Sequence, residues 1–183
     1  LVVFLKKPIL HHWGQIIAGL GVLFLGMGMM SDAMAPLRES EFFINLMTQM
    51  SNPLLGILVG MVFTAIIQSS SASVGILQTL ASSGLIGLHS AAFILFGQNI
   101  GTCITAVLAS IGTSRNAKRT TIIHLLFNVI GTVIFTTICI LTPLTNLFES
   151  LLPTSPAGQI AALHTTFNIT ADGIFHIRRH VVG

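Results

Sequence analysis

Long apolar runs alternate with short polar interruptions along most of the chain, a pattern typical of helices in a membrane. A helix needs about 20 apolar residues to cross a bilayer. Runs suited to this lie at 14–31, 85–111, 120–142 and 157–177, and we expect a membrane-spanning helix at each. The last two are expected to be joined by a loop, and the charged stretch before residue 52 to form an amphipathic segment at the membrane surface.

One apolar stretch is interrupted too early to cross a bilayer. The run at 54–67 is followed by the polar sequence QSSS at 68–71, and then by a second short run at 74–80. Two half-length arms around a polar tip predict a re-entrant helical hairpin over residues 54–83, which a membrane tolerates where the tip faces protein or water. The sequence SNP at 51–53 predicts the start of its first helix.

The span at 85–111 contains a second polar interruption, GQNIGT at 97–102. Two glycines around an amide pair predict a discontinuous helix. Hydroxyl and carbonyl oxygens suit a hard cation such as sodium, whereas free N–H groups at the positive end of a helix suit an anion. Broken helices near mid-membrane are where secondary transporters hold substrate and coupling ion. The two breaks therefore favour a transport site.

Composition supports a membrane protein. Hydrophobic residues make up 52% of the 183 residues and charged residues only 7%, against about 25% in soluble domains, and the mean hydropathy is +0.89. The net charge of +3 comes from few, dispersed basic residues, so no nucleic-acid partner is indicated. Cys103 and Cys139 lie in apolar runs and are expected to behave as small hydrophobic residues.

The charges also predict a topology. If residues 54–83 enter and leave on one side, seven of the eight basic residues fall on one face of the membrane, in agreement with the positive-inside rule. Those seven are Lys6, Lys7, Arg115, Lys118, Arg119, Arg178 and Arg179. Arg38 falls on the other face among three acidic residues. We therefore expect a multi-pass protein of the cytoplasmic (inner) membrane with both chain ends in the cytoplasm.

The first residue is Leu, not Met, so we expect a fragment of a longer protein. Lys6 and Lys7, the apolar run and SDAMA at 31–35 also fit a secretory signal peptide. We expect a membrane helix instead, because everything downstream is membrane-like.

A short motif occurs twice, as HLLFN at 124–128 and HTTFN at 164–168. His and Asn four residues apart lie on one helical face. We expect polar contacts between helices, and the alternative is that these residues line a transport path.

Other classes of protein fit less well. SSSASVG is not a Gly-x-Ser-x-Gly elbow and the hairpin contains no general base, so an enzyme is not expected. There is no Walker sequence to bind ATP. No Arg, Lys, Asp or Glu lies between Glu41 and Arg115, so a bound anion would need hydroxyls, helix ends and a bound cation to offset its charge. Serines in membrane helices usually bond back to their own helix, but a run of four polar residues and a second break favour a binding site.

Three stretches, NPLLGILVGMVFTAIIQSSSASVGIL, ILFGQNIGTCITAVLAS and NAKRTTIIHLLFNVIGTVIF, resemble the sodium-dependent phosphate cotransporter family, the bacterial relatives of the type II Na/Pi cotransporters. The resemblance covers roughly residues 14–175. It implies one half, the second repeat, of an inverted-repeat transporter, with sodium and phosphate bound where two hairpin tips meet. The implied phosphate-binding residues are Ser69, Ser70 and Ser71, and the implied sodium-binding residues are Gln68, Ser69, Asn99, Thr102 and, more weakly, Thr64.

The chain departs from that family's pattern in three ways. It holds one QSSS run, so a missing first repeat or a second copy of the chain would have to complete the site, and we expect truncation. Residues 1–183 do not include the soluble C-terminal regulatory domain that many bacterial members of the family carry. Gln98 stands where the family leads us to expect a small residue.

The expected function is sodium-coupled transport of inorganic phosphate across the cytoplasmic membrane, with sodium as coupling ion and no other metal or cofactor. Two alternatives remain open: a non-transporting scaffold or sensor subunit, and a phosphate exporter.

Overall fold

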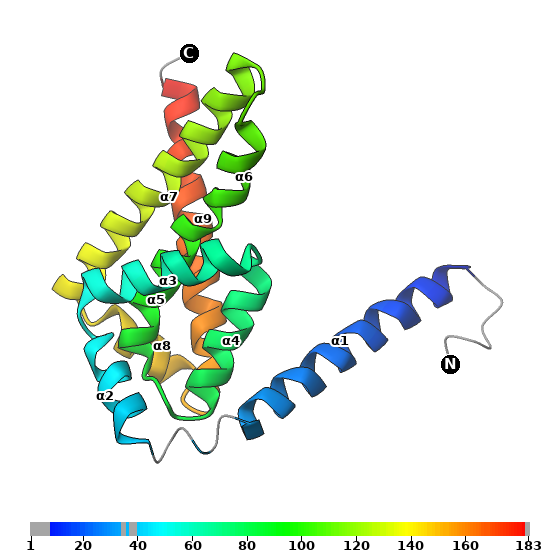
Figure 1. The fold of residues 1–183 in the computed structure, drawn as a ribbon, viewed down its shortest axis with the longest axis vertical. Coiled ribbons are helices and arrows are strands. Elements are labelled where there is room, and N and C mark those ends of the chain that lie inside the picture. Colours follow the sequence, from blue (N-terminus) through cyan, green and yellow to red (C-terminus); the bar gives the residue numbers. More distant parts are fainter. Residues whose placement is uncertain (1–7, 34–35, 37–39, 182–183) are drawn as a thin grey trace.

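The computed structural model describes residues 8–33, 36 and 40–181, which fold into helices joined by short connections (Figure 1). This confirms the all-helical class. The helices are α1 (Pro8–Ala33), α2 (Glu41–Gln49), α3 (Pro53–Ile67), α4 (Ser70–Ser82), α5 (Leu88–Gly101), α6 (Cys103–Ser110), α7 (Arg115–Leu141), α8 (Leu144–Leu151) and α9 (Pro156–Val181).

Three helical stretches of the described residues are long and apolar enough to cross a membrane. They are His12–Met29 within α1, Leu88–Ser110 across α5 and α6, and Arg115–Leu141 in α7. They coincide with three of the four predicted spans. The fourth predicted span falls in α9, where His164 and Asn168 interrupt the apolar residues.

The expected loop before α9 is wrong in part, because residues Leu144–Leu151 form helix α8. Leu144 and Phe148 lie one helical turn apart and pack against the core, and the buried Phe148 anchors the helix on the bundle. Apolar residues on one face stabilise a short helix through packing. The predicted surface segment before residue 52 contains helix α2.

Helix α5 lies at the centre of the bundle, with all residues from 91 to 99 buried. Phe96 of α5 stacks on Phe167 of α9 with ring centroids 5.5 Å apart, and Phe135 of α7 lies 5.0 Å from Phe167. Such aromatic pairs contribute about 0.5–1.5 kcal/mol each beyond their buried area. This cluster therefore joins α5, α7 and α9.

Helices α3 and α5 cross with their backbones in direct contact. A Cβ added at Gly60 of α3 would overlap the carbonyl of Ile94, and one added at Gly97 of α5 would overlap the carbonyl of Ile57. Glycines four residues apart allow this close approach in membrane helices. The glycines of the GQNIGT segment thus serve packing, and α5 continues as a helix through Gly97 to Gly101.

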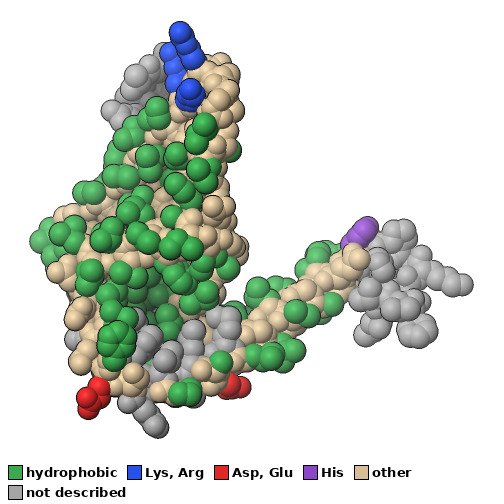
Figure 2. Space-filling view, viewed as in Figure 1, with side chains coloured by type: hydrophobic (Ala, Val, Ile, Leu, Met, Phe, Trp, Pro, Cys, Tyr) green, Lys and Arg blue, Asp and Glu red, His purple; other side chains and the backbone are tan. Residues whose placement is uncertain are grey.

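Charged side chains gather at opposite ends of the bundle (Figure 2). The exposed basic residues Arg115, Lys118 and Arg119 lie at the start of α7, and acidic side chains lie at the other end. This separation matches the predicted sidedness, although the orientation in a membrane stays a prediction. The described part of the structure does not include residues 1–7 and 182–183. It also does not include the side chains of Lys6, Lys7, Arg38, Arg178 and Arg179.

One capping residue stabilises the start of α3. The Asn52 Oδ1 atom accepts hydrogen bonds from the backbone N–H groups of Leu54 (3.0 Å) and Leu55 (3.4 Å), and Pro53 occupies the first turn. This confirms the predicted helix start.

We expect Asn52→Ala to lower the free energy of unfolding by about 1 kcal/mol, because two N–H groups lose their acceptor. Thermal and denaturant unfolding in detergent measures the change. Asn52→Asp keeps an acceptor oxygen and should unfold like the wild type. Equal stability of the alanine and aspartate variants would show that the cap contributes nothing.

Candidate functional site

The polar run at 68–71 lies where one helix ends and the next begins. Helix α3 ends at Ile67 and α4 starts at Ser70. Gln68 has a left-handed backbone conformation (φ 56°, ψ 24°), which is uncommon for a residue other than glycine. The Ser69 Oγ atom accepts a hydrogen bond of 3.3 Å from the N–H of Ala72 and caps α4. Residues 54–83 are therefore two helices and not one continuous rod.

The course of α2, α3 and α4 returns the chain to the end from which it came (Figure 1). The start of α2 and the end of α4 both lie at the lower end, and the break lies well short of the upper end, where α6 joins α7. From the break, α3 and α4 diverge instead of packing along their lengths. The position of the break in a membrane remains a prediction.

The side chains of the run are accessible. Gln68, Ser70 and Ser71 are exposed and Ser69 is half-buried. The first-turn N–H groups of a helix lack intrahelical acceptors and carry the positive end of its dipole. Hydroxyls and backbone N–H groups thus meet at the start of α4, an arrangement that can hydrogen-bond an anion.

The second predicted break is reduced to a single residue. Thr102 lies between α5 and α6 but has near-helical angles (φ −61°, ψ −24°). Its hydroxyl donates to the carbonyl of Asn99 at 2.7 Å. The expectation of a discontinuity across 97–102 is thus too wide, because glycine packing against α3 stabilises the helix up to Gly101.

Two neighbouring amides of this segment contact two different helices. The Gln98 Nε2 atom donates to the carbonyl of Ser73 on α4 at 3.1 Å, and the Asn99 Oδ1 atom lies 3.1 Å from the Nε2 atom of His164 on α9. Gln98 is 2% and Asn99 7% exposed. Since Ser73 lies one helical turn beyond Ser69, the segment lies at the level of the first turns of α4.

Several buried polar atoms around the break have no hydrogen-bond partner. Within the described residues, the buried side-chain atoms without a partner are Thr64 Oγ1, Ser73 Oγ, Gln98 Oε1, Asn99 Nδ2 and Thr136 Oγ1. Four of the five belong to α3, α4 and α5. By contrast, the hydroxyls of Thr79 and Thr165 bond back to their own helices, the usual arrangement.

Each unpaired buried group costs roughly 1–3 kcal/mol. This part of the bundle therefore holds polar groups that the fold does not satisfy. Of the predicted residues, Thr64 and Asn99 belong to this group, and Thr64 lies one turn before Gln68. Ser73 was not predicted; its spacing of four residues from Ser69 was the available signal.

The repeated His-Asn motif makes polar contacts between helices, as predicted, but with a different residue in each copy. In α7, the Asn128 Nδ2 atom donates to the Sγ atom of Cys103 (3.3 Å) and to the carbonyl of His124 (3.0 Å). In α9, His164 contacts Asn99 while the exposed Asn168 bonds back to its own helix. Cys103 is a buried free thiol, as is Cys139, in agreement with their prediction as small core residues.

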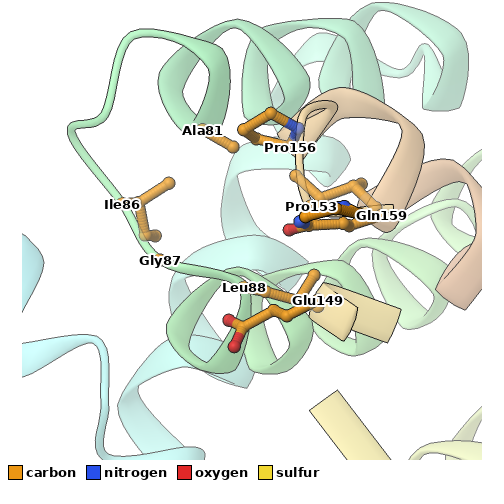
Figure 3. A pocket seen from close by; sticks show the side chains of 9 residues that line it. Ala81, Ile86, Gly87, Leu88, Glu149, Pro153, Pro156 and Gln159 are labelled. Carbon is orange, nitrogen blue, oxygen red and sulfur yellow. The ribbon is translucent and has the colours of Figure 1, made fainter. Parts of the chain in front are cut away.

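A cleft of about 320 Å³ lies between the end of α4, helix α8 and the start of α9 (Figure 3). Its lining includes Leu88, Glu149 and Gln159, and the Gln159 amide already donates to the carbonyl of Leu152. Ala81 at its edge lies about 16 Å along α4 from Ser70, at 1.5 Å per residue. The cleft is separate from the break and contains none of the predicted site residues.

The arrangement agrees with a comparison against known families. The model of the family described as Na+/Pi-cotransporter matches residues 25–153, more than half of the chain and including both polar segments. The chain belongs to the Na+/Pi-cotransporter family. This confirms the resemblance found from the sequence.

Individual members of the Na+/Pi-cotransporter family align over different lengths. Protein YqeW of Bacillus subtilis is 36% identical over 167 residues, which cover 91% of this chain and 53% of YqeW. Human sodium-dependent phosphate transport protein 2B is 42% identical over 71 residues, 39% of this chain and 10% of that protein. The putative inorganic phosphate export protein YjbB of Salmonella typhimurium is 27% identical over 158 residues, 85% of this chain and 28% of YjbB.

The chain thus spans about half or less of the length of these curated relatives. No solved structure matches it.

Proposed function

We propose that this family member moves inorganic phosphate across the cytoplasmic membrane together with sodium, and that Ser69, Ser70 and Ser71 bind the phosphate. The observation that supports this most directly is the exposed polar run at the start of α4. Hydroxyl donors, first-turn N–H groups and the helix dipole all favour an anion there. Named relatives that transport phosphate support the choice of anion.

Sodium is proposed to bind oxygen atoms next to the phosphate. The Thr64 Oγ1 atom has no partner, and the Thr102 hydroxyl donates its proton to Asn99, which leaves its oxygen lone pairs for a cation. Gln68 and Ser69 complete this proposed set at the break. Asn99 differs from the other expected ligands, because its amide oxygen already accepts a hydrogen bond from His164.

We further propose that α3 and α4 form a re-entrant hairpin and that a second such hairpin completes the site. The greater length of the relative YqeW, of which the aligned residues cover 53%, favours an additional repeat as its source over a second copy of the chain. The basic end of the bundle is proposed to face the cytoplasm.

Vesicles that contain the full-length protein, with the additional repeat that is proposed to complete the site, test this function through uptake of radiolabelled phosphate. We expect an inward sodium gradient to raise the initial rate severalfold over an equal gradient of choline. Uptake that ignores sodium, or no uptake beyond that of protein-free vesicles, would refute sodium-coupled import.

Export is the second candidate, favoured by the likeness to YjbB. Vesicles preloaded with labelled phosphate distinguish it. Net release that exceeds uptake under the same gradients would assign the protein to export.

A further inference from the structure

The contact between His164 and Asn99 joins helices whose residues lie 65 positions apart in the sequence. The Asn99 Oδ1 atom can only accept a hydrogen bond, so the Nε2 atom of His164 must carry the proton and donate it. Asn99 is 7% exposed and His164 half-buried. The pair therefore lies mostly inside the bundle, with Asn99 on the buried side of the contact.

This bond decides which end of the Asn99 amide is available. With the oxygen turned toward His164, the Nδ2 atom is left buried and without a partner. An amide nitrogen donates hydrogen bonds to anion oxygens and cannot be a ligand for a cation. The geometry at Asn99 is thus suited to an oxyanion and not to sodium.

Asn128 provides an internal comparison. Its Nδ2 atom donates to both Cys103 and His124, so both of its N–H bonds are satisfied by the protein. Asn99 is almost equally buried, at 7% exposure against 5% for Asn128. However, its Nδ2 atom donates no hydrogen bond. An Asn that served only to join helices would resemble Asn128.

The position of Asn99 agrees with a role at the tip. Its neighbour Gln98 contacts Ser73, which lies four residues, about 6 Å along a helix, from Ser69. The Gln98–Asn99 segment is therefore about one helical turn from the serines of the break.

We propose that His164 is a positioning residue that orients the Asn99 amide so that its Nδ2 atom donates to phosphate bound at the Ser69–Ser71 tip. This rests on the proposed function. It changes the role expected of Asn99 from sodium ligand to hydrogen-bond donor for the oxyanion.

The test compares His164→Phe, which keeps a ring but loses the N–H, with His164→Gln, which keeps a donor in a similar place. His124→Phe is the matched control, because His124 holds the same motif position in α7 but is exposed. Initial uptake rates are measured against phosphate at fixed sodium, and against sodium at fixed phosphate.

We expect His164→Phe to raise the half-saturating phosphate concentration about tenfold, the loss expected when one hydrogen bond to a charged group is weakened. The half-saturating sodium concentration should change less than twofold. His164→Gln should recover most of the phosphate affinity, and His124→Phe should resemble the wild type. A shift in sodium dependence alone, or no shift at all, would overturn the proposal.

Asn99→Asp provides a second test that can be used if His164→Phe does not fold. The carboxylate still accepts the His164 N–H but has no donor, so phosphate affinity should fall while sodium affinity does not. Equilibrium binding of labelled phosphate to the purified protein, with and without sodium, separates this proposal from transport itself. Wild-type binding without sodium-driven uptake would refute the proposed function alone, whereas Asn99→Asp binding equal to wild type would refute the role of Asn99.

Discussion

Replacing Gly60 with alanine is expected to lower the free energy of unfolding by about 3 kcal/mol, at the upper end of the range for overpacking. The added Cβ atom would meet the backbone carbonyl of Ile94. A backbone group cannot rotate away as a side chain can, so α3 and α5 must separate. Thermal unfolding in detergent, together with the yield of inserted protein, measures the effect.

Gly75→Ala is the matched control, because Gly75 also lies within a helix but nothing lies within 4 Å of an added Cβ atom. Alanine is favoured over glycine in a helix by up to about 1 kcal/mol, so this variant should be as stable as the wild type or more so. Gly97→Ala, which would meet the carbonyl of Ile57, should resemble Gly60→Ala. Similar stability of Gly60→Ala and Gly75→Ala would contradict the close crossing.

Replacing both Ser70 and Ser71 with alanine is expected to reduce phosphate uptake at low phosphate about 100-fold. Each hydroxyl is proposed to bond a charged ligand, and such bonds contribute about 1.5–3 kcal/mol each. Both side chains are exposed, so stability should hardly change. Uptake rates are compared per inserted molecule.

Ser69 is left intact in this variant because its Oγ atom caps α4, and its loss would combine a structural with a functional effect. Ser82→Ala, at an exposed position near the other end of α4, should transport normally. Normal uptake by the double variant would disprove phosphate binding at the tip. A scaffold or sensor subunit would give no sodium-driven uptake in the wild type either.

The elements that the sequence predicted well are those that depend on local chemistry. The polar run at 68–71 interrupts the apolar pattern, and the helix does break at its first two residues, Gln68 and Ser69. Asn52 and Pro53 carry a start signal that needs no distant partner. Apolar length alone predicted three helical stretches that the structure contains.

Features that depend on distant partners were not predictable. Gly56, Gly60, Gly97 and Gly101 are visible as two pairs spaced by four residues, but nothing in the sequence says that one pair faces the other. For that reason, the pair Gly97 and Gly101 was interpreted as a break in the helix predicted over residues 85–111. The partner of Asn99 was equally hidden, because His164 and His124 occupy identical motifs and only tertiary packing buries one of them.

The two arms of the break are attached to the bundle in different ways. Helix α3 fits against α5 through touching main chains, whereas α4 is attached through side chains alone. These are the buried Leu77 and Ala81 and the hydrogen bonds from Gln98 to Ser73 and from Gln78 to Ala157. Side-chain contacts can re-form in a neighbouring position, but main chains in direct contact have no room to slide. If the two arms move relative to one another about Gln68, we expect α3 to stay with α5 and α4 to move, together with Ser70 and Ser71.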